Sequence, residues 1–339
     1  MAVIHFLNVK QGDCSIIEHN SGRITVIDVC NAKEDTNETR FSEALDRAFS
    51  KATVLGNFNQ KDYPVNPILY MKDRLLMNVW RFILTHPDMD HMDGIEAFWN
   101  EFNPPNFWDT NNTCNKDDDF NGGSPYNYED WNFYKTLRAG NGPTGLKRLA
   151  LASEAKGKYW NQDENGIGGG DGLHVLAPTA DLVRQANDCD DFNDCSYVLL
   201  YRTGNFRIVF GGDSHDDTWN HILEEHEQSV KNVDLLIAPH HGRKSDRSYD
   251  FLDILQPKMT FFGNAASEHL AYDAWNYRDL PFITNNQAGC MVVRVGPTSL
   301  DLYVTNETFA RKKNPYTFYS EALSAWYMEE ISASVEATA

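Results

Sequence analysis

Thr85-His86-Pro87-Asp88-Met89-Asp90-His91-Met92-Asp93-Gly94 is the most informative segment of this 339-residue chain. It follows the apolar run 80–84, which predicts a buried strand, and it leads into 94–99, which begins like an amphipathic helix. Because a metal site needs ligands on rigid elements, a strand end that feeds a helix start is a suitable place for one. Its metal-binding side chains are His86, Asp88, Asp90 and His91.

The spacing within this stretch favours two adjacent metal ions over one. In an extended chain, His86 and Asp88 are two residues apart and point the same way. The turn that follows directs Asp90 and His91 to a second point. Aspartates before a helix are also ordinary helix caps, but four ligand-type residues within six positions favour a metal site.

The composition predicts a folded globular protein, with 41% hydrophobic and 12% aromatic residues. A net charge of −19 argues against a broad nucleic-acid surface, although a local basic cleft and small anionic substrates are compatible with it. Neither a membrane span nor a signal-peptide pattern is seen in the sequence. The six cysteines lack CxxC spacing, which is typical of free thiols in a reducing compartment, so we expect a cytoplasmic protein without membrane association.

Acidic and histidine residues recur at the ends of apolar runs along the chain. Asp28, Asp213 and His240 each follow a run that predicts a strand. Several strands that end in ligand-type residues can build one shared site at the edge of a sheet.

The chain is expected to form one main domain over 1–300, followed by a C-terminal extension over 301–339 that packs on it. Residues 319–333 predict the helix of this extension. The polar, acidic segment 103–131 predicts a surface insertion that covers the site or binds a protein partner. Residues 146–155 predict a further helix.

These motifs resemble those of the metallo-β-lactamase superfamily, most closely the metallohydrolase domain of ComEC-type DNA-uptake proteins. His86-x-Asp88-x-Asp90-His91 is similar to that group's metal motif, in which Asp replaces the superfamily's usual second His. Pro239-His240-His241-Gly242-Arg243-Lys244-Ser245 resembles its Pro-His-His-Gly-Ser-Lys-Thr/Ser run. Supporting matches are Leu7–Asp13, Ile27-Asp28, Asn193-x-x-Ser196, Gly212-Asp213, His269, and Thr284 with Gly289.

This resemblance spans residues 3–296 and implies an α/β fold, a four-layer αββα sandwich with a dinuclear metal site along one edge of the two sheets. The chain departs from the group at Asn8, Lys10 and Arg243, where the group has Asp, Gly and Ser.

The resemblance also implies a ligand set for two divalent ions, zinc or manganese. His86 and Asp88 would bind the first ion, and Asp90 and His91 the second. Asp213 would bridge both ions, and His240 would complete the second site. Asp28 would orient the ligands from behind. The third-motif His of the superfamily is missing, which leaves the first site one ligand short, with Asn193 or Asp194 in that region.

Other residues are candidates for catalysis or substrate binding. Lys10, Arg243 and Lys244 could form a basic cleft for a phosphodiester, with Asn193 beside it, or Arg243 and Lys244 could be ordinary surface charges. His241 could donate a proton to a leaving group or support His240. The candidate catalytic residues are Asp90, His241 and His269; a structural role for His269 is the alternative.

The leading hypothesis is a metal-dependent hydrolase of phosphodiesters, a nuclease or nucleotide phosphodiesterase, in which two ions about 3.5–4 Å apart activate a hydroxide. One alternative is an ester, lactone or thioester hydrolase on the same fold. Another is a non-catalytic binding protein that keeps the metals as structure.

Overall fold

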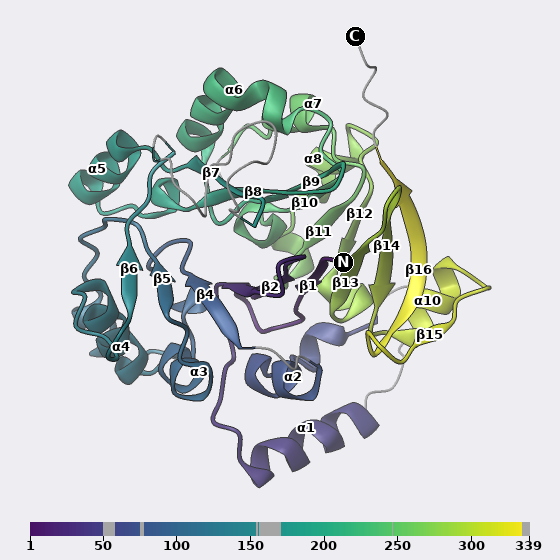
Figure 1. Ribbon diagram of the computed structural model, residues 1–339, viewed down its shortest axis with the longest axis horizontal. Helices are drawn as coiled ribbons and strands as arrows, with labels where there is room; N and C mark the ends of the chain where they lie inside the picture. Colours follow the sequence, from purple (N-terminus) through teal and green to yellow (C-terminus); the bar gives the residue numbers. More distant parts are fainter. Residues whose placement is uncertain (50–57, 75–77, 154, 156–170, 246, 334–339) are drawn as a thin grey trace.

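Two β-sheets packed face to face form the centre of the fold (Figure 1). The computed structural model describes all residues except 50–57, 75–77, 154, 156–170, 246 and 334–339. Within the described residues the larger sheet has ten strands, in the order β15-β16-β14-β13-β1-β2-β3-β4-β5-β6. The run from β3 to β6 is parallel and the other pairs are antiparallel. Its strands are β1 (Val3–Phe6), β2 (Ser15–Glu18), β3 (Ile24–Ile27), β4 (Val79–Ile83), β5 (Asn106–Trp108), β6 (Lys147–Leu149), β13 (Met291–Val295), β14 (Ser299–Val304), β15 (Tyr319–Ser320) and β16 (Ala325–Ser332).

The smaller sheet has the order β12-β11-β10-β9-β8-β7 within the described residues. The strands β9 to β12 run parallel to one another, whereas β7, β8 and β9 pair antiparallel. Its strands are β7 (Leu173–Ala177), β8 (Val198–Thr203), β9 (Phe206–Phe210), β10 (Leu235–Ile237), β11 (Thr260–Phe262) and β12 (Phe282–Thr284).

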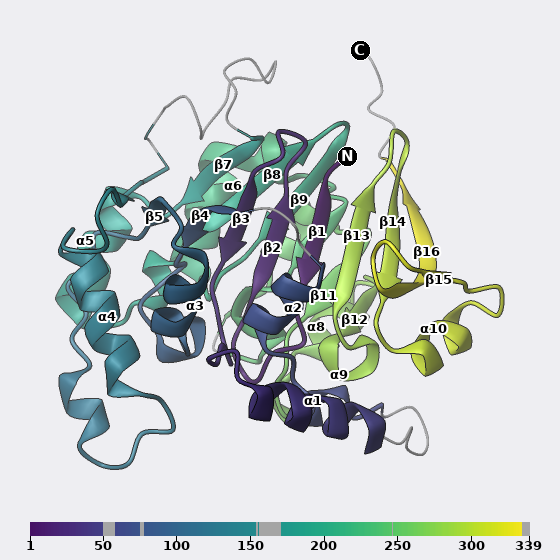
Figure 2. The same cartoon turned by 60° about the horizontal axis from the view of Figure 1, so that its bottom comes forward.

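Helices cover the outer face of each sheet, as Figure 2 shows for α2 and α3 over the larger one. The apolar side chains of α2, α3 and α4 pack on that sheet, and those of α6, α7 and α8 pack on the smaller one. The helices are α1 (Asn37–Phe49), α2 (Pro67–Arg74), α3 (Ile95–Phe102), α4 (Tyr128–Arg138), α5 (Ala180–Cys189), α6 (Asp216–Val230), α7 (Phe251–Leu255), α8 (Tyr272–Asn276), α9 (Asn285–Ala288) and α10 (Glu307–Lys313).

Three apolar clusters fill the spaces between these four layers. The central cluster lies between the sheets, and Phe6 of β1 stacks on Phe261 of β11 within it. The other two clusters lie between each sheet and its helices. Burial on both sides explains why every residue of β3 and β10 is buried and why the sequences of these strands, apart from Thr25, are apolar instead of alternating. The layers therefore form an αββα sandwich, which confirms the predicted fold class.

The helix predicted over 319–333 is wrong, because these residues form β15 and β16 and extend the larger sheet. The buried residues Ala325, Met328 and Ile331 are three apart, which imitates a helix. Ala325 lies in a separate small cluster with Val292 and Tyr303, whereas Met328 and Ile331 both face the central cluster. The spacing of Met328 and Ile331 arises from an irregularity in the pairing of β14 with β16, where Tyr303 pairs with Tyr327 but Leu302 pairs with Glu329. An extra residue in one strand shifts the alternation by one position.

The segment after α3 also differs from its prediction. Residues 106–108 form the buried strand β5 inside the larger sheet, and α4 covers that sheet with Trp131 and Tyr134 fully buried. The predicted insertion therefore contributes to the core at both ends, and its surface part lies between them. The helix predicted over 146–155 is wrong, since 147–149 form β6, parallel to β5.

No helix among the described residues is long and apolar enough to cross a membrane.

Candidate metal centre

The carboxyl ends of strands from both sheets meet at one edge of the sandwich. Asp28 follows β3, Thr85 and His86 follow β4, and Asp213 follows β9. The Thr85 carbonyl accepts a hydrogen bond from the Tyr197 amide (3.0 Å), which joins the end of β4 to the residue before β8. Backbone pairing between the sheets therefore fixes the distance between ligand candidates that are far apart in sequence.

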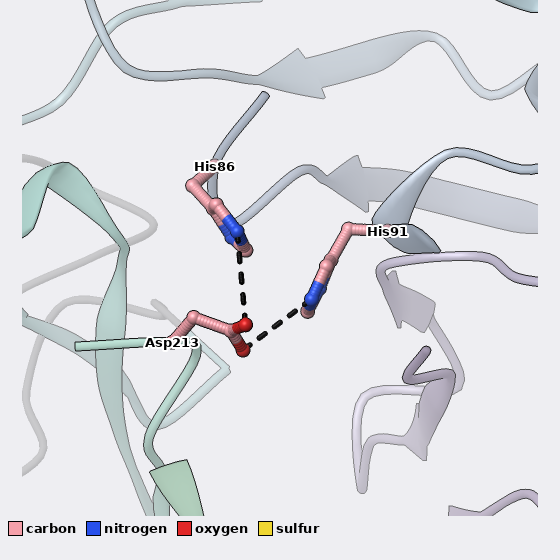
Figure 3. Close-up of side chains that lie close together, drawn as sticks. All are labelled: His86, His91 and Asp213. Atoms are coloured by element: carbon pink, nitrogen blue, oxygen red, sulfur yellow. Dashed lines mark ion pairs between the residues drawn. The ribbon is translucent and has the colours of Figure 1, made fainter. Parts of the chain in front are cut away.

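Asp213 lies among four histidines. Its Oδ1 lies 3.3 Å from Nε2 of His91, and its Oδ2 lies 3.8 Å from Nε2 of His86. The same Oδ2 lies 3.7 Å from Nε2 of His240 and 3.7 Å from Nε2 of His241. Figure 3 shows the rings of His86 and His91 directed at the Asp213 carboxylate.

A second carboxylate, Asp90, faces two of these histidines, His91 and His241, from the short turn Met89–His91. Its Oδ2 lies 3.5 Å from Nε2 of His241. Within the described part of the chain, the ligand-type residues that lie close enough to share an ion form three overlapping sets: His86, His91 and Asp213; Asp90, His91 and His241; and Asp13, Asp213 and His241.

The buried polar atoms of this cluster fit a divalent metal. Nε2 of His86, His91 and His241 and Oδ1 of Asp213 are buried, and none has a hydrogen-bond partner among the described residues. An unpaired buried polar atom is costly. Imidazole nitrogens and carboxylate oxygens are ligands of zinc and manganese, so ions bound within these overlapping sets would satisfy the four atoms.

The other ring nitrogen of two of these histidines faces a buried aspartate. Nδ1 of His91 lies 2.8 Å from Oδ2 of Asp28, and Nδ1 of His241 lies 2.9 Å from Oδ1 of Asp13. Asp28 also accepts hydrogen bonds from the amide and the hydroxyl of Thr85, both at 2.7 Å. A carboxylate that is hydrogen-bonded to Nδ1, as Asp28 is at His91, fixes the proton there and leaves Nε2 free to bind an ion. At His241, Asp13 lies within ion-pair distance but not in hydrogen-bond geometry.

Asp28→Asn is expected to weaken metal binding by about 10–100-fold without unfolding the protein. Asp28 accepts at both oxygens, so an amide nitrogen at either position would face a hydrogen atom of Thr85 or His91. Calorimetric titration of metal-free protein measures the loss, and circular dichroism checks the fold. Unchanged affinity would show that Asp28 does not orient His91.

Three site residues adopt left-handed backbone conformations that non-glycine residues rarely take. The φ angles are 58° at Asp28, 52° at His240 and 56° at His241. Such strain persists only where surrounding structure imposes it, and it concentrates at functional sites. The amide of His240 is held at Gly212, whose carbonyl lies 2.8 Å away.

Charges within the cluster shift the pKa values of its members. Burial disfavours a protonated His241, but Asp13 and Asp213 outweigh it and raise the pKa of His241 to about 10. Burial is likewise opposed at His91, whose pKa is raised well above its ordinary value by Asp213 and Asp28. Conversely, burial would raise the pKa of Asp213, but His91 and His241 hold it well below the ordinary range. The carboxylates therefore favour positive charge beside them, and protonated His91 and His241 provide it in the metal-free protein.

Metal affinity is expected to rise with pH across the neutral range. A proton on Nε2 must leave before that nitrogen binds an ion, so apparent affinity falls as pH drops below the His241 pKa of about 10, by up to about tenfold per unit for each proton released. Calorimetry in two buffers of different ionisation enthalpy counts the released protons. A metal affinity that does not change with pH would show that His241 carries no extra proton in the metal-free protein.

Asp88 and His240 lie beside this cluster, but neither belongs to the three sets of described residues that could share an ion. Asp88 is 36% exposed; its Oδ2 lies 3.5 Å from Nε2 of His86 and its Oδ1 lies 2.9 Å from Nζ of Lys116. Burial would raise the pKa of Asp88, but His86 and Lys116 hold it below its ordinary value.

Two side chains from the following loop contact Nδ1 of His240. Nη2 of Arg247 lies 3.2 Å away and Oγ of Ser245 lies 2.8 Å away. A guanidinium only donates, so Nδ1 accepts, and a neutral His240 carries its proton on Nε2. Burial lowers the pKa of His240 to about 4, with Asp213 acting in the opposite direction and the cations His241 and Arg247 adding to the lowering. His240 therefore presents an Nε2–H group towards Asp213.

A pocket of about 480 Å³ lies beside the cluster. A Cβ at Gly12 would lie 1.7 Å from the carbonyl oxygen of Asp90 and 2.9 Å from Cβ of Cys30, so the turn 10–13 packs directly on the Asp90 backbone. Among the lining residues, Lys10 and Lys61 are basic, and Pro125 and Tyr126 come from the predicted insertion.

The structure places the remaining predicted residues around this centre. Lys10 is exposed and lines the pocket, whereas Lys244 is exposed and Arg243 half-buried past the histidine pair. Asn193 is half-buried, with Nδ2 3.5 Å from Nε2 of His215. His269 is 56% exposed and its ring pairs with Glu268 at 3.8 Å, so the contacts of its ring do not join it to the cluster.

Four residues of the site were missed at the level of sequence: Asp13, Thr85, Lys116 and Arg247. Asp13 stands in the motif 7–13 and could have been found there. Thr85 directly precedes His86, so a supporting role could have been suggested. Lys116 and Arg247 carry no sequence signal, because only the folded chain brings them to Asp88 and His240.

No protein-family model and no curated protein matches this chain. Among solved structures, the chain is similar to the metallo-β-lactamase fold protein YhfI from Bacillus subtilis, with 10% identity, a TM-score of 0.41 and coverage of 84% of this chain and 95% of that chain. It is also similar to Igni18, a metallo hydrolase from Ignicoccus hospitalis, with 9% identity, a TM-score of 0.43 and coverage of 87% of this chain and 100% of that chain. A diphosphatase from the PhnP family has 12% identity, a TM-score of 0.38 and coverage of 84% of this chain and 94% of that chain. Similarities this low assign no chemistry to this chain.

Proposed function

We propose that this protein is a metal-dependent hydrolase that acts on phosphodiesters, as a nuclease or nucleotide phosphodiesterase. The observation that carries the proposal is the set of three buried histidine Nε2 atoms without partners among the described residues, gathered around Asp213 and backed by Asp28 and Asp13. The sequence resemblance to the metallo-β-lactamase superfamily supports the same chemistry.

We propose two neighbouring positions for divalent ions, zinc or manganese. The main position is formed by Asp90, His91, His241 and Asp213, because Nε2 of His241 lies between the two carboxylates. The other position is formed by His86 with the shared Asp213, and Asp88, whose Oδ2 lies 3.5 Å from Nε2 of His86, joins it as the resemblance implies. When bound, such ions act as Lewis acids that activate water and stabilise the charge of a phosphoryl group.

In this proposal His240 and His241 exchange the roles that the sequence suggested. Both nitrogens of His241 face carboxylates, and its ring is 1% exposed, so it is suited to bind an ion. His240 is suited to hold a proton at Nε2, because Arg247 and Ser245 contact its Nδ1. A neutral N–H at that position can donate a hydrogen bond to an oxygen of the substrate and stabilise the charge that develops there.

The charges around the centre support an anionic substrate. Arg247 is 7% exposed, with Nε and Nη1 unpartnered among the described residues. Lys10 and Lys61 line the neighbouring pocket together with Asp62 and Asp93. A guanidinium with free donors matches the geometry of a phosphate group. Ester, lactone and thioester groups carry no phosphate charge for the guanidinium to bind, so hydrolysis of these substrates is the second candidate function.

A substrate panel tests the proposal. Metal-loaded protein is expected to cleave bis(p-nitrophenyl) phosphate, dinucleotides, or single-stranded DNA or RNA faster than p-nitrophenyl acetate, a lactone and a thioester. Preference for the carboxylic substrates would overturn the phosphodiester assignment, and no turnover of any would favour a binding protein. His240→Ala is expected to keep its metal and to lose most activity, whereas His241→Ala is expected to lose metal.

A further inference from the structure

Lys116 brings a positive charge to the candidate centre from the segment between β5 and α4. Its Nζ lies 2.9 Å from Oδ1 of Asp88, and its side chain is 20% exposed. The other oxygen of Asp88 faces Nε2 of His86 at 3.5 Å. The ammonium therefore engages one carboxylate oxygen of a proposed metal ligand.

The chain on both sides of Lys116 is held to α4, by the backbone of Cys114 and by the side chain of Asp117. Nη1 of Arg138 donates to the carbonyl of Cys114 at 2.8 Å. On the other side, Oδ1 of Asp117 accepts from the indole of Trp131 at 2.9 Å. Both donors belong to α4, whose Trp131 is fully buried. Lys116 is thus held beside Asp88 by packed structure and is not a free surface lysine.

The two proposed ion positions differ in this contact. Among the described residues, the ion pairs of Lys116 are with Asp88 and not with Asp90 or Asp213. A divalent ion that binds Asp88 must approach an ammonium that already shares its carboxylate, and like charges a few ångströms apart repel. An ion at the main position does not face this competition.

We propose that Lys116 competes with a divalent ion for Asp88, so that the protein holds one ion tightly and fills the position at His86 and Asp88 only at higher metal concentration. This inference rests on the metal sites of the proposed function, and it assigns the segment between β5 and α4 a regulatory role. Lys116 supplies part of the positive charge at Asp88 when only one ion is bound.

Titration of metal-free protein with Zn²⁺ or Mn²⁺, followed by calorimetry and native mass spectrometry, tests the inference without any substrate. Wild type is expected to show one tight and one weaker ion. Lys116→Met, which keeps the length of the side chain, is expected to bind the second ion about tenfold more tightly and to leave the first unchanged. Lys116→Arg keeps the charge and is expected to resemble wild type. Lys147→Met, at an exposed lysine in β6, is the matched control.

Two results would overturn the inference: equal affinities for both ions in wild type, or a second ion that Lys116→Met binds no better than wild type does. Weaker second binding in that variant would show that Lys116 supports Asp88 as a ligand instead. The double variant Asp88→Asn with Lys116→Met is expected to show no gain, since the carboxylate for which both cations compete is gone. A protein that passes these tests but cleaves no phosphodiester would refute the substrate assignment and leave this inference standing.

Discussion

Asp213→Ala is expected to abolish tight metal binding and to lower hydrolytic activity by more than about a thousandfold. The carboxylate of Asp213 lies within 3.8 Å of Nε2 of four histidines, and both proposed ion positions share it. Loss of a supporting residue behind a ligand already costs about 10–100-fold in metal affinity or activity. Loss of the shared ligand should cost more.

Elemental analysis after dialysis and hydrolysis of bis(p-nitrophenyl) phosphate measure the two losses in Asp213→Ala. Asp188→Ala replaces an exposed aspartate near the end of α5 and should behave as wild type. A variant without Asp213 that retains stoichiometric metal and full activity would show that the cluster is structural. Circular dichroism should show a folded protein. Asp213 helps to raise the pKa of His91 and His241, so these histidines can stay neutral once its carboxylate is removed.

Gly12→Ala is expected to be the most disruptive single-methyl change in the site. An added Cβ would lie 1.7 Å from the carbonyl oxygen of Asp90, a distance that requires the backbone to move. Overpacking of this kind costs roughly 1–3 kcal/mol, and it would move Asp90 and His91 together. Both the midpoint of thermal unfolding and the metal affinity should therefore fall.

Gly122→Ala is the control for that change, since a Cβ at Gly122 has no atom within 4 Å. Thermal unfolding by circular dichroism and metal titration compare the two variants. A Gly12→Ala protein with wild-type stability and affinity would mean that the turn 10–13 can shift without disturbing Asp90.

The sequence correctly predicts which strand ends carry the residues of the site, because the pattern that marks each strand end is local. The apolar runs before Asp28, His86 and Asp213 form β3, β4 and β9, and each ligand candidate follows the strand that predicted its position. Parallel neighbours then bring the ends together. Which histidine of the pair at 240–241 faces Asp90 depends on the left-handed backbone there, and periodicity contains no information on that.

The failures of sequence reasoning have tertiary causes. Residues 147–149, Lys-Arg-Leu, have no preference for a strand and become β6 because β5 offers an edge to pair with. The extra residue in β16 shifts its alternation to a helix-like spacing. Lys116 reaches Asp88 only through the packing of α4, so neither spacing nor composition could show it.

Anomalous diffraction from crystals grown with Mn²⁺ or Zn²⁺ would locate the ions at the cluster around Asp213. A strong anomalous peak is expected within bonding distance, about 2.0–2.3 Å, of Nε2 of His91, Nε2 of His241 and an oxygen of Asp213. A second peak near His86 and Asp88 is expected to be weaker or to depend on the metal concentration. Absence of any peak at Asp213, or a peak bound only by surface carboxylates elsewhere, would show that this cluster is not a metal centre.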